Sequence, residues 1–386
     1  MNNFKLKIGA LLSSAMMMVA VSCSDDFLDV APTGLLAEAQ LSSLAGIEAS
    51  LIAAYSQVNG RGNRLGSPSN WVWGSIRGGE ANKGTDPGDF TTINPIQRYE
   101  NDAAGGEMGS KWNVCYEGIA RVNNVLRLLN NPGPDVTEAD KKRISAQARF
   151  LRGHYYFELK RDYNNTPYVD ETVDYGSGLE DVKNDKDLWP FIEADFQFAI
   201  DNLPPTQAQV GRVNSWAAKA YMAKALLYQG KFAQAKTLFD DVIANGVTSN
   251  GLKYDLVPYY DDMFRGANDN HQESVWAYQS AANTGSVANA NPMFDLNFPY
   301  NTGPAGPGNC CGFFQPSFTF VNAFRTDANG LPLLDKSYNN PGNRVKSDMG
   351  LNSDQAFTPD TGNLDPRLDH TVGRRGIPYL DWQDHP

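Results

Sequence analysis

Apolar residues recur at steps of three and four along the first two thirds of the chain, which is the spacing of amphipathic α-helices. The first such stripe contains Leu41, Leu44, Ile47, Leu51 and Tyr55. Further stripes predict helices over residues 112–126, 137–159, 188–203, 216–228 and 232–243. Residues 59–109 are rich in Gly, Pro, Asn and Asp and predict a long loop region. The pattern therefore predicts a mainly α-helical protein.

The last two predicted helices match the pairing of a tetratricopeptide repeat. Gly230 lies at the turn between them, and Phe232, Ala235 and Phe239 occupy the aromatic, small and aromatic positions of the second helix. A small residue lets paired helices approach, and the aromatic side chains fill the groove toward the next pair. The earlier helices have suitable lengths but lack such clear signatures. We therefore expect a tetratricopeptide-like helical-repeat scaffold.

After Gly246 the periodic stripes give way to short apolar runs, such as residues 274–278, separated by segments rich in Gly, Pro and Asn. This composition predicts an irregular, loop-rich part with short strands and one short helix near residues 318–324. The predicted organisation is a signal peptide over residues 1–22, a helical region over 23–250 and a loop-rich C-terminal region over 251–386.

The first residues predict export. Lys5 and Lys7 precede an apolar stretch over residues 8–21, which is shorter than the about 20 residues that a membrane-spanning helix needs. This arrangement is typical of a signal peptide. The small residue Ser22 before Cys23 resembles a lipoprotein signal, in which the cysteine is acylated and becomes the new N-terminus. We expect lipidation at Cys23; ordinary cleavage after Ser22 is the alternative.

The charge of the chain excludes some partners. It contains 33 Lys and Arg residues against 44 Asp and Glu residues, and removal of the signal peptide with its two lysines takes the net charge from −11 to −13. Such acidity disfavours binding to nucleic-acid phosphates or to anionic lipid headgroups. Besides Cys23 there are only Cys115, Cys310 and Cys311, too few for a disulfide scaffold. A vicinal disulfide, a bridge to Cys115 and free thiols all stay open.

Sequence motifs of hydrolytic or nucleotide chemistry are missing. The four histidines form no His-Glu-x-x-His pair, no serine lies in Gly-x-Ser-x-Gly, and no Gly-x-x-x-x-Gly-Lys-Ser/Thr loop occurs. The acidic neighbours Asp240-Asp241 and Asp261-Asp262 are interpreted as surface groups and not as a glycosidase pair. His154 is interpreted as a surface or core histidine with satisfied hydrogen bonds, and not as a general base. Asp86 and Asp89 are the nearest candidates for a calcium site, without an EF-hand pattern. We predict a non-enzymatic protein with no cofactor and no assigned metal site, and a structural calcium stays open.

Aromatic residues in the loops indicate a binding surface. Trp71 and Trp73 flank Val72 in a segment rich in Gly and Ser, which we expect to be extended, so that the two alternate side chains share a face. Planar rings stack on the apolar faces of sugars, while Arg, Asn and carboxylate groups bind the hydroxyls. The predicted ligand-binding residues are Trp71, Trp73, Arg77, Glu80, Asn82 and Tyr300.

The alternative interpretation is that these rings anchor long loops to the protein. The same alternative applies to Phe313 and Phe314, which follow Tyr300 in the second long loop region. Trp276 lies in an apolar run and is interpreted as a core residue.

Several segments, taken in chain order, point to a known family. The acidic start of the mature chain is Cys23-Ser24-Asp25-Asp26-Phe27-Leu28-Asp29, and residues 148–159, followed by Tyr163 and Pro167, read Ala-Arg-Phe-Leu-Arg-Gly-His-Tyr-Tyr-Phe-Glu-Leu. Residues 211–220 lead into the clearest repeat pair. Two late motifs are Gln315-Pro316-Ser317 with Val321-Asn322-Ala323-Phe324, and Asp365-Pro366-Arg367-Leu368. In this combination the segments resemble the SusD/RagB family of Bacteroidetes outer-membrane lipoproteins.

The resemblance implies a tetratricopeptide-like scaffold with a loop-rich second part that carries much of the ligand surface. It implies a lipid-anchored protein, exposed on the cell outer membrane, that captures an oligosaccharide and delivers it to a SusC-like TonB-dependent barrel. Family members usually continue past the Asp-Pro-Arg-Leu motif, so the sequence looks C-terminally truncated. Two alternatives stay open: peptide or glycopeptide cargo in the same role, and a surface glycoside hydrolase.

Overall fold

The computed structural model describes residues 38–62, 72–84, 86–176, 178–279, 299–300, 310–352, 354–379 and 383–384. Helices dominate these residues, which confirms the mainly α-helical prediction. The principal helices are α3 (Glu38–Leu41), α4 (Leu44–Ser56), α6 (Gly106–Asn130), α7 (Glu138–Tyr163), α8 (Trp189–Asn202), α9 (Ser215–Tyr228) and α10 (Phe232–Asn245). Shorter helical segments are η1 (Gln57–Gly62), η2 (Val72–Ile76), η3 (Thr91–Ile93), α5 (Asn94–Gln97), η4 (Leu179–Asp181), η5 (Tyr260–Phe264), η6 (Gly266–Asn268), α11 (Phe318–Asn322), η7 (Ser337–Asn339) and α12 (Leu368–Thr371).

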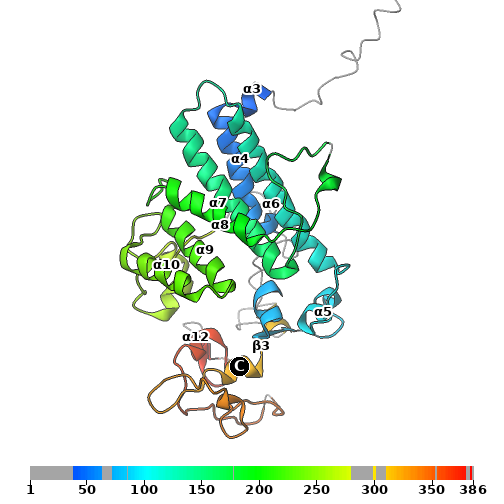
Figure 1. Ribbon diagram of the computed structural model, residues 1–386. Helices are drawn as coiled ribbons and strands as arrows, with labels where there is room; N and C mark the ends of the chain where they lie inside the picture. Colours follow the sequence, from blue (N-terminus) through cyan, green and yellow to red (C-terminus); the bar gives the residue numbers. More distant parts are fainter. Residues whose placement is uncertain are drawn as a thin grey trace, which may run out of the picture.

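The long helices form a continuous stack in chain order. Helix α4 packs on α6 and α7, and each helix from α6 to α10 packs on the next (Figure 1). Figure 1 also shows the chain from β3 onward, in orange to red, gathered at one end of this stack. Such nearest-neighbour packing is the arrangement of helical-repeat proteins, as predicted.

Most helix ends agree with the sequence pattern. Helix α7 begins after Thr137, whose side chain accepts from the backbone N–H of Asp140, and the Asp140 carboxylate reaches back to the Thr137 N–H in a capping box. Helix α6 is the exception, because it begins at Gly106, well before the expected residue 112. Its first buried positions include Glu107 and Lys111, and a pattern of apolar residues does not register buried polar ones.

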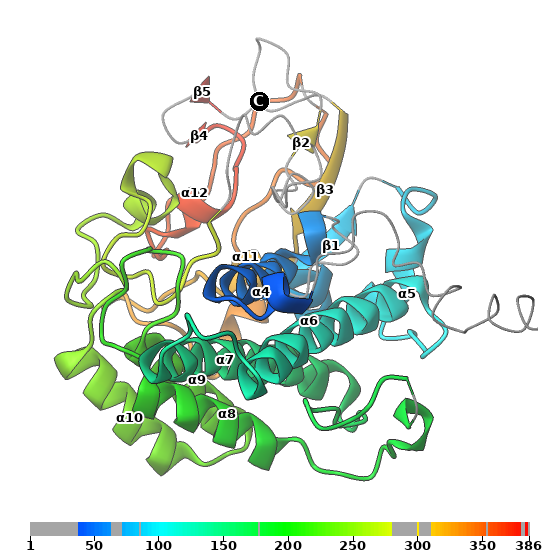
Figure 2. The same cartoon turned by 90° about the horizontal axis from the view of Figure 1, so that it is seen from above.

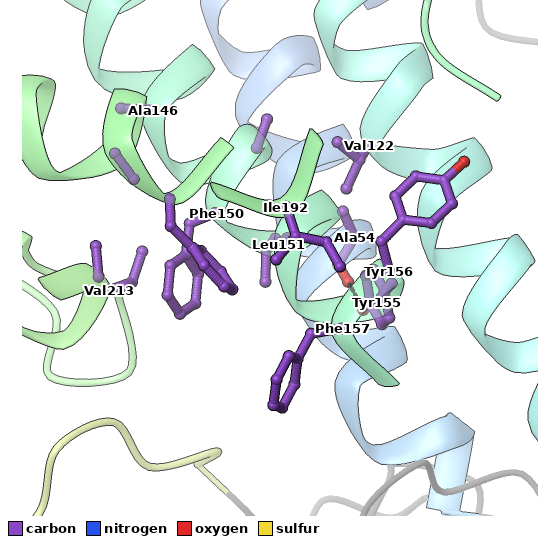
Figure 3. Packing of buried hydrophobic residues seen from close by; sticks show 14 of the residues in the cluster. Ala54, Val122, Ala146, Phe150, Leu151, Tyr155, Tyr156, Phe157, Ile192 and Val213 are labelled. Atoms are coloured by element: carbon purple, nitrogen blue, oxygen red, sulfur yellow. Dashed lines mark hydrogen bonds between the residues drawn. The ribbon is translucent and has the colours of Figure 1, made fainter. Parts of the chain in front are cut away.

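The main hydrophobic core lies between α4 and α6–α9 and is rich in aromatic side chains. Phe150, Leu151, Tyr155, Tyr156 and Phe157 are all buried on α7, which has neighbours on several sides (Figure 3). The Tyr155 hydroxyl donates to the Ala54 carbonyl at 2.7 Å, drawn as a dashed line in Figure 3. Burying this hydroxyl is tolerated because it has a hydrogen-bond partner.

Two glycines allow the helices around α7 to approach closely. A Cβ at Gly118 of α6 would lie 2.5 Å from the Tyr155 ring, and one at Gly153 would lie 2.8 Å from the Phe196 ring on α8. Any larger residue at either position forces the helices apart. The aromatic core of α7 therefore depends on these two positions.

The α9–α10 pair has the geometry predicted from the repeat signature. Gly230 lies between the helices with φ +73°, a left-handed conformation that favours glycine. Ala235 is 1% exposed and belongs to the main core, so the small position is a close contact. Helix α10 ends at Asn245, as expected.

A small sheet joins the region before α6 to the later part of the chain. Its order is β1 (Ala81–Gly84), β3 (Cys310–Pro316) and β2 (Pro299–Tyr300), all antiparallel, and it lies outside the helical stack (Figure 2). A second pair, β4 (Pro378–Tyr379) and β5 (Gln383–Asp384), is formed near the end of the chain. The expected short strands are present.

The two late sequence motifs meet in one small unit. Val345, Leu368 and Val372 are buried together, with Phe320 and Phe324 packed against them. Bonds across the unit run from the Val345 N–H to the Asn322 side-chain oxygen at 2.9 Å and from the Asp365 N–H to the Phe324 carbonyl at 2.8 Å. The motifs are therefore linked by direct contacts.

Two further findings concern membranes and cysteines. Within the described ranges, no helix combines the length and the apolar character needed to cross a bilayer. Cys115 is a buried free thiol, so it forms no bridge to Cys310 or Cys311. Burial also raises the pKa of the Cys115 thiol well above its usual range, which keeps it unreactive.

Candidate functional site

The segment that carries Trp73 is helical and not extended as predicted. Val72–Ile76 forms one π-helical turn, in which Val72 and Ile76, four positions apart, are both buried. They form a second hydrophobic cluster with Ala81, Ile93 and Ile96, and burying them favours the turn over an extended strand. Trp71 lies outside the described residues, so the shared face predicted for the two tryptophans stays untested.

The small sheet brings together residues from distant parts of the sequence. Asn82 of β1 lies opposite Gln315 of β3, and Tyr300 of β2 lies opposite Cys310. Both Asn82 and Gln315 are exposed. The sheet therefore joins the two loop regions that supplied the predicted binding residues.

Close backbone contact at one residue fixes this strand pairing. Gly84 has φ +85°, and a Cβ there would lie 2.1 Å from the Gly312 carbonyl oxygen. Only glycine meets both conditions. Ser317, which follows β3, adds bonds from its N–H to the Glu80 carbonyl and from its hydroxyl to the Gly79 carbonyl, both at 2.8 Å.

Three aromatic residues around the sheet have strained backbone conformations. Phe90, Tyr99 and Phe314 have positive φ angles of 44°, 58° and 58°, which are costly for bulky residues. The Phe90 and Phe313 ring centroids are 5.6 Å apart, and the Tyr99 hydroxyl donates to the Arg77 carbonyl at 2.8 Å. Strained aromatic residues of this kind gather at binding sites, which makes this unit the leading candidate.

A buried ionic cluster holds the turn that carries Trp73 and Arg77 against α6 and α7. The Lys111 ammonium lies 3.1 Å from the Glu158 carboxylate and also pairs with Asp162, which in turn lies 2.8 Å from Arg77. The Lys111 side chain is 1% exposed, and its Nζ is 5.0 Å from the centroid of the Trp73 ring. One face of that ring is therefore next to a buried cation.

Charge in this cluster is strongly stabilised. Burial by itself raises the pKa of the Glu158 carboxyl, but Lys111 and Arg161 outweigh it and hold that pKa at about 2. Burial by itself lowers the pKa of Lys111, and the Glu158 and Asp162 carboxylates raise it above its usual value. Lys111 and Glu158 are therefore both ionised at neutral pH, and Arg77 is used to hold the turn.

The predicted ligand residues differ in their exposure to solvent. Trp73 is half-buried and packs against the second cluster, whereas Glu80 and Asn82 are exposed on the surface. Sequence reasoning did not single out Gln315 as a binding residue. Its position in the Gln-Pro-Ser motif was the available signal, but its place beside Asn82 follows only from the strand register.

The loop considered for calcium is bound to a lysine. The buried ammonium of Lys83 donates to the carbonyl oxygens of Asp86 and Asp89, and the Asp86 carboxylate accepts from the Gly88 and Asp89 N–H groups. The Lys83 ammonium thus binds the carbonyl oxygens of this loop. No group of three metal-ligating side chains occurs among the residues that the structure describes.

Three of the four acidic neighbours, Asp240, Asp241 and Asp261, form ordinary surface ion pairs. Asp240 contacts Lys236 and Asp241 contacts Lys219, each at 2.5 Å, while Asp261 contacts Arg265 at 2.7 Å. Exposed pairs of this kind stabilise a protein only weakly. They show no feature of a catalytic dyad.

His154 lies in the core, which is one of its two predicted locations. Its hydrogen bonds, however, are not satisfied. Neither ring nitrogen has a hydrogen-bond partner within the described part of the chain. Burial lowers the pKa of His154 to about 4, so the ring is neutral at physiological pH. It contacts the Tyr155, Tyr221 and Trp276 rings, and its role is structural.

A cavity of about 650 Å³ beside α4 is mostly apolar. Arg212 at its wall pairs with Glu48 at 3.0 Å, and the Trp276 Nε1–H donates to the Gly211 carbonyl at 3.0 Å. The Trp276 and Phe150 ring centroids are 5.0 Å apart, and Trp276 packs on the main core as expected. Because these polar groups are bonded within the protein, the cavity offers less to a polar ligand than the sheet does.

The fold and site describe a helical-repeat scaffold that carries an aromatic, amide-bearing surface, which is the architecture of a binding protein. The chain matches the family described as "Starch-binding associating with outer membrane" over residues 26–227. This match spans more than half of the chain, and the protein therefore belongs to this SusD-like family, as the motifs predicted.

Relatives agree with this assignment. A SusD-like protein of Bacteroides ovatus is 27% identical over 350 residues, which cover 83% of this chain and 58% of that protein. Among solved structures, a laminarin binding SusD-like protein is 27% identical with a TM-score of 0.50, covering 60% of this chain and 50% of that one. Surface glycan-binding protein A from Bacteroides uniformis is 26% identical with a TM-score of 0.50, covering 60% and 51%. The chain thus spans about half the length of these relatives, and these solved structures are named as binding proteins and not as enzymes.

Proposed function

We propose that the protein binds oligo- or polysaccharide at the cell surface and delivers it to a SusC-like TonB-dependent barrel in the outer membrane. Membership of the family supports this role, since its description combines starch binding with the outer membrane. Two similar structures are named for binding laminarin and surface glycans. Acylation of Cys23 would hold the protein to the membrane in a surface-exposed position.

The glycan lies, in this proposal, on the outer side of the β1–β3–β2 sheet. The observation that carries it is the register that sets the exposed side chains of Asn82 and Gln315 opposite each other. Amide groups donate and accept hydrogen bonds at once, as sugar hydroxyls do. Trp71, Trp73, Glu80 and Tyr300 complete the proposed surface, and Arg77 keeps the Trp73 turn in place.

We also propose the division of the mature chain near residue 250. Two observations on the described residues support it: their last long helix, α10, ends at Asn245, and the buried members of the main core all precede residue 236. The loop-rich part from residue 251 onward then supplies β2 and β3 to the glycan-binding surface.

The test is calorimetric titration with laminarin oligosaccharides first and a panel of other neutral glycans next. Asn82→Ala and Gln315→Ala are expected to weaken binding of the recognised glycan about tenfold each, the effect of losing roughly one good hydrogen bond to ligand. Asn184→Ala is the control, because Asn184 is exposed on a loop far along the chain. Thermal unfolding should be unchanged in all three variants.

Normal binding by both sheet variants would contradict the proposed surface. Binding of peptides with no glycan bound would instead favour the alternative cargo. Trp73→Ala serves as a further comparison, since truncation of a packed tryptophan also costs about 3–5 kcal/mol of stability. Loss of affinity beyond that explained by unfolding identifies Trp73 as a ligand contact.

A further inference from the structure

A second cavity, of about 270 Å³, lies within the small C-terminal unit, between α11 and the segment after α12. Its walls include Lys346, Asp348, Phe357, Arg374 and Arg375. It is formed by part of the first late motif, Pro316 and Val321, together with residues 345–348, 357, 359 and 372–375, and it adjoins the sheet at Pro316, the last residue of β3. The volume suits a single pyranose ring and not a folded segment of protein.

Positive charge outweighs negative charge in this cavity. Among the described residues that line it, three side chains are cationic and one, that of Asp348, is a carboxylate. The positive charge of Arg374 is balanced by the Asp369 carboxylate, which accepts hydrogen bonds of 2.6 and 2.9 Å from the guanidinium. The remaining charges, from Lys346, Arg375 and Asp348, sum to a net positive cavity on a chain whose overall charge is −11.

Two backbone carbonyls help to orient the Arg375 guanidinium. It donates to the Asn352 carbonyl at 3.3 Å and to the Gln355 carbonyl, and its side chain is 17% exposed. The Asp348 carboxylate is 3.8 Å from this guanidinium. Carbonyl oxygens orient a guanidinium without cancelling its charge, so Arg375 presents a fixed positive charge to the cavity.

Lys346 and the aromatic walls complete the site. The Lys346 side chain is exposed, and its Nζ lies 5.2 Å from the centroid of the Phe357 ring. Within the described ranges this ammonium forms no ion pair. Phe318 at the rim is 58% exposed. An aromatic ring beside an ammonium presents an apolar face and a cation to the same ligand.

We propose that this cavity binds an anionic sugar unit, a pyranose that carries a carboxylate or a sulfate ester, and so extends the recognised cargo to acidic glycans. The ring of the sugar packs against Phe318 and Phe357, and its anionic group lies between Lys346 and Arg375. This inference rests on the proposed function, since it adds a second contact for the same class of ligand.

Nucleic acid and anionic membrane are poor alternatives for these charges. Both need several cations spread along a surface, whereas Lys346 and Arg375 converge on one cavity. The acidity of the remaining chain opposes long polyanions and favours a ligand with isolated charges.

The experiment compares the full mature chain with two matched pairs of probes by calorimetry at low salt. One pair is an oligogalacturonide and its fully methyl-esterified, neutral form; the other is a sulfated galactan oligosaccharide and its desulfated form. An acidic member is expected to bind about tenfold more tightly than its neutral partner. The probe pair that shows this difference in affinity identifies the recognised anionic group as a carboxylate or as a sulfate ester.

Variants of the exposed Lys346 test the cavity itself. Lys346→Gln should weaken binding of the acidic probe about fivefold, and Lys346→Glu more strongly, since it adds repulsion. Lys183→Glu makes the same change of charge on an exposed loop elsewhere and should leave binding unchanged. All variants should unfold at the temperature of the wild-type protein, because the Lys346 side chain is at the surface.

Equal affinity for acidic and neutral members, or wild-type affinity of Lys346→Glu for the acidic probe, overturns the inference. If the protein binds laminarin oligosaccharides or other neutral glycans but none of the acidic probes, the inference is wrong, whereas the proposed function is supported. Absence of binding to every glycan contradicts the proposed function and the inference together.

Discussion

Replacement of Lys111 by Met should destabilise the protein through the buried ionic cluster. Methionine keeps the apolar stem but removes the cation that faces Glu158 and Asp162. Lys111 and Arg161 together lower the pKa of Glu158 from 4.5 to about 2, and the whole shift corresponds to about 3 kcal/mol of stability at neutral pH, of which Lys111 contributes a part. Breaking a buried ion pair by removing one partner costs about 3–5 kcal/mol, and we expect a loss in that range.

The pH dependence gives a second, independent signature. Because the folded pKa of Glu158 lies below its unfolded value, the stabilisation is fully present above about pH 4.5 and is lost as the pH falls toward 2. In Lys111→Met the pKa of Glu158 should rise, since burial is less opposed. The difference in unfolding free energy between wild type and variant should therefore shrink on acidification.

Urea denaturation followed by circular dichroism, at about pH 7 and about pH 3.5, measures both effects. Lys219→Met is the matched control, because it breaks the Lys219–Asp241 pair, whose side chains are 20% and 38% exposed. This surface pair should contribute only about 0.2–1 kcal/mol. A loss for Lys111→Met no greater than that of the control would refute the reasoning.

Three further predictions concern packing, strand pairing and membrane attachment. Ala235→Phe should cost about 1–3 kcal/mol by overpacking the α9–α10 contact, with the exposed Ala233→Phe of the same helix as control; equal melting temperatures would argue against the contact. Gly84→Ala should destabilise the protein more than Gly330→Ala: both glycines have positive φ, but an added Cβ lies 2.1 Å from the Gly312 carbonyl oxygen at Gly84 and meets nothing within 4 Å at Gly330. Equal losses of stability in chemical denaturation would contradict this prediction. Cys23→Ala should move the protein from membrane to soluble fractions, and its retention in membranes without the barrel partner would exclude the lipid anchor.

The helical scaffold was predictable because its signals are local. Stripes such as Leu44, Ile47 and Leu51, and the turn at Gly230, report on neighbours within one or two helical turns. The early start of α6 was missed, since its buried residues include Glu107 and Lys111, whose partners lie on α7. Polar burial depends on a distant partner that a pattern of apolar residues does not contain.

The candidate site was predictable only in part. Aromatic and amide residues in the loops indicated the region of the candidate sheet surface, but the pairing of Asn82 with Gln315 arises from strand register between distant segments. The helical turn of Trp73 was missed because burial of Val72 and Ile76 outweighs the loop-like composition around them. The cationic cavity around Lys346 likewise joins segments that look unrelated in the sequence.

The central claim is that the protein binds glycan through the sheet surface without cleaving it. The most direct measurement titrates the recognised glycan into wild type and Asn82→Ala by calorimetry and then analyses the recovered glycan by mass spectrometry. The account predicts a saturable isotherm for wild type, a clear loss of affinity in the variant and a glycan of unchanged chain length. Shortened glycan, or identical affinity in the two proteins, would contradict it.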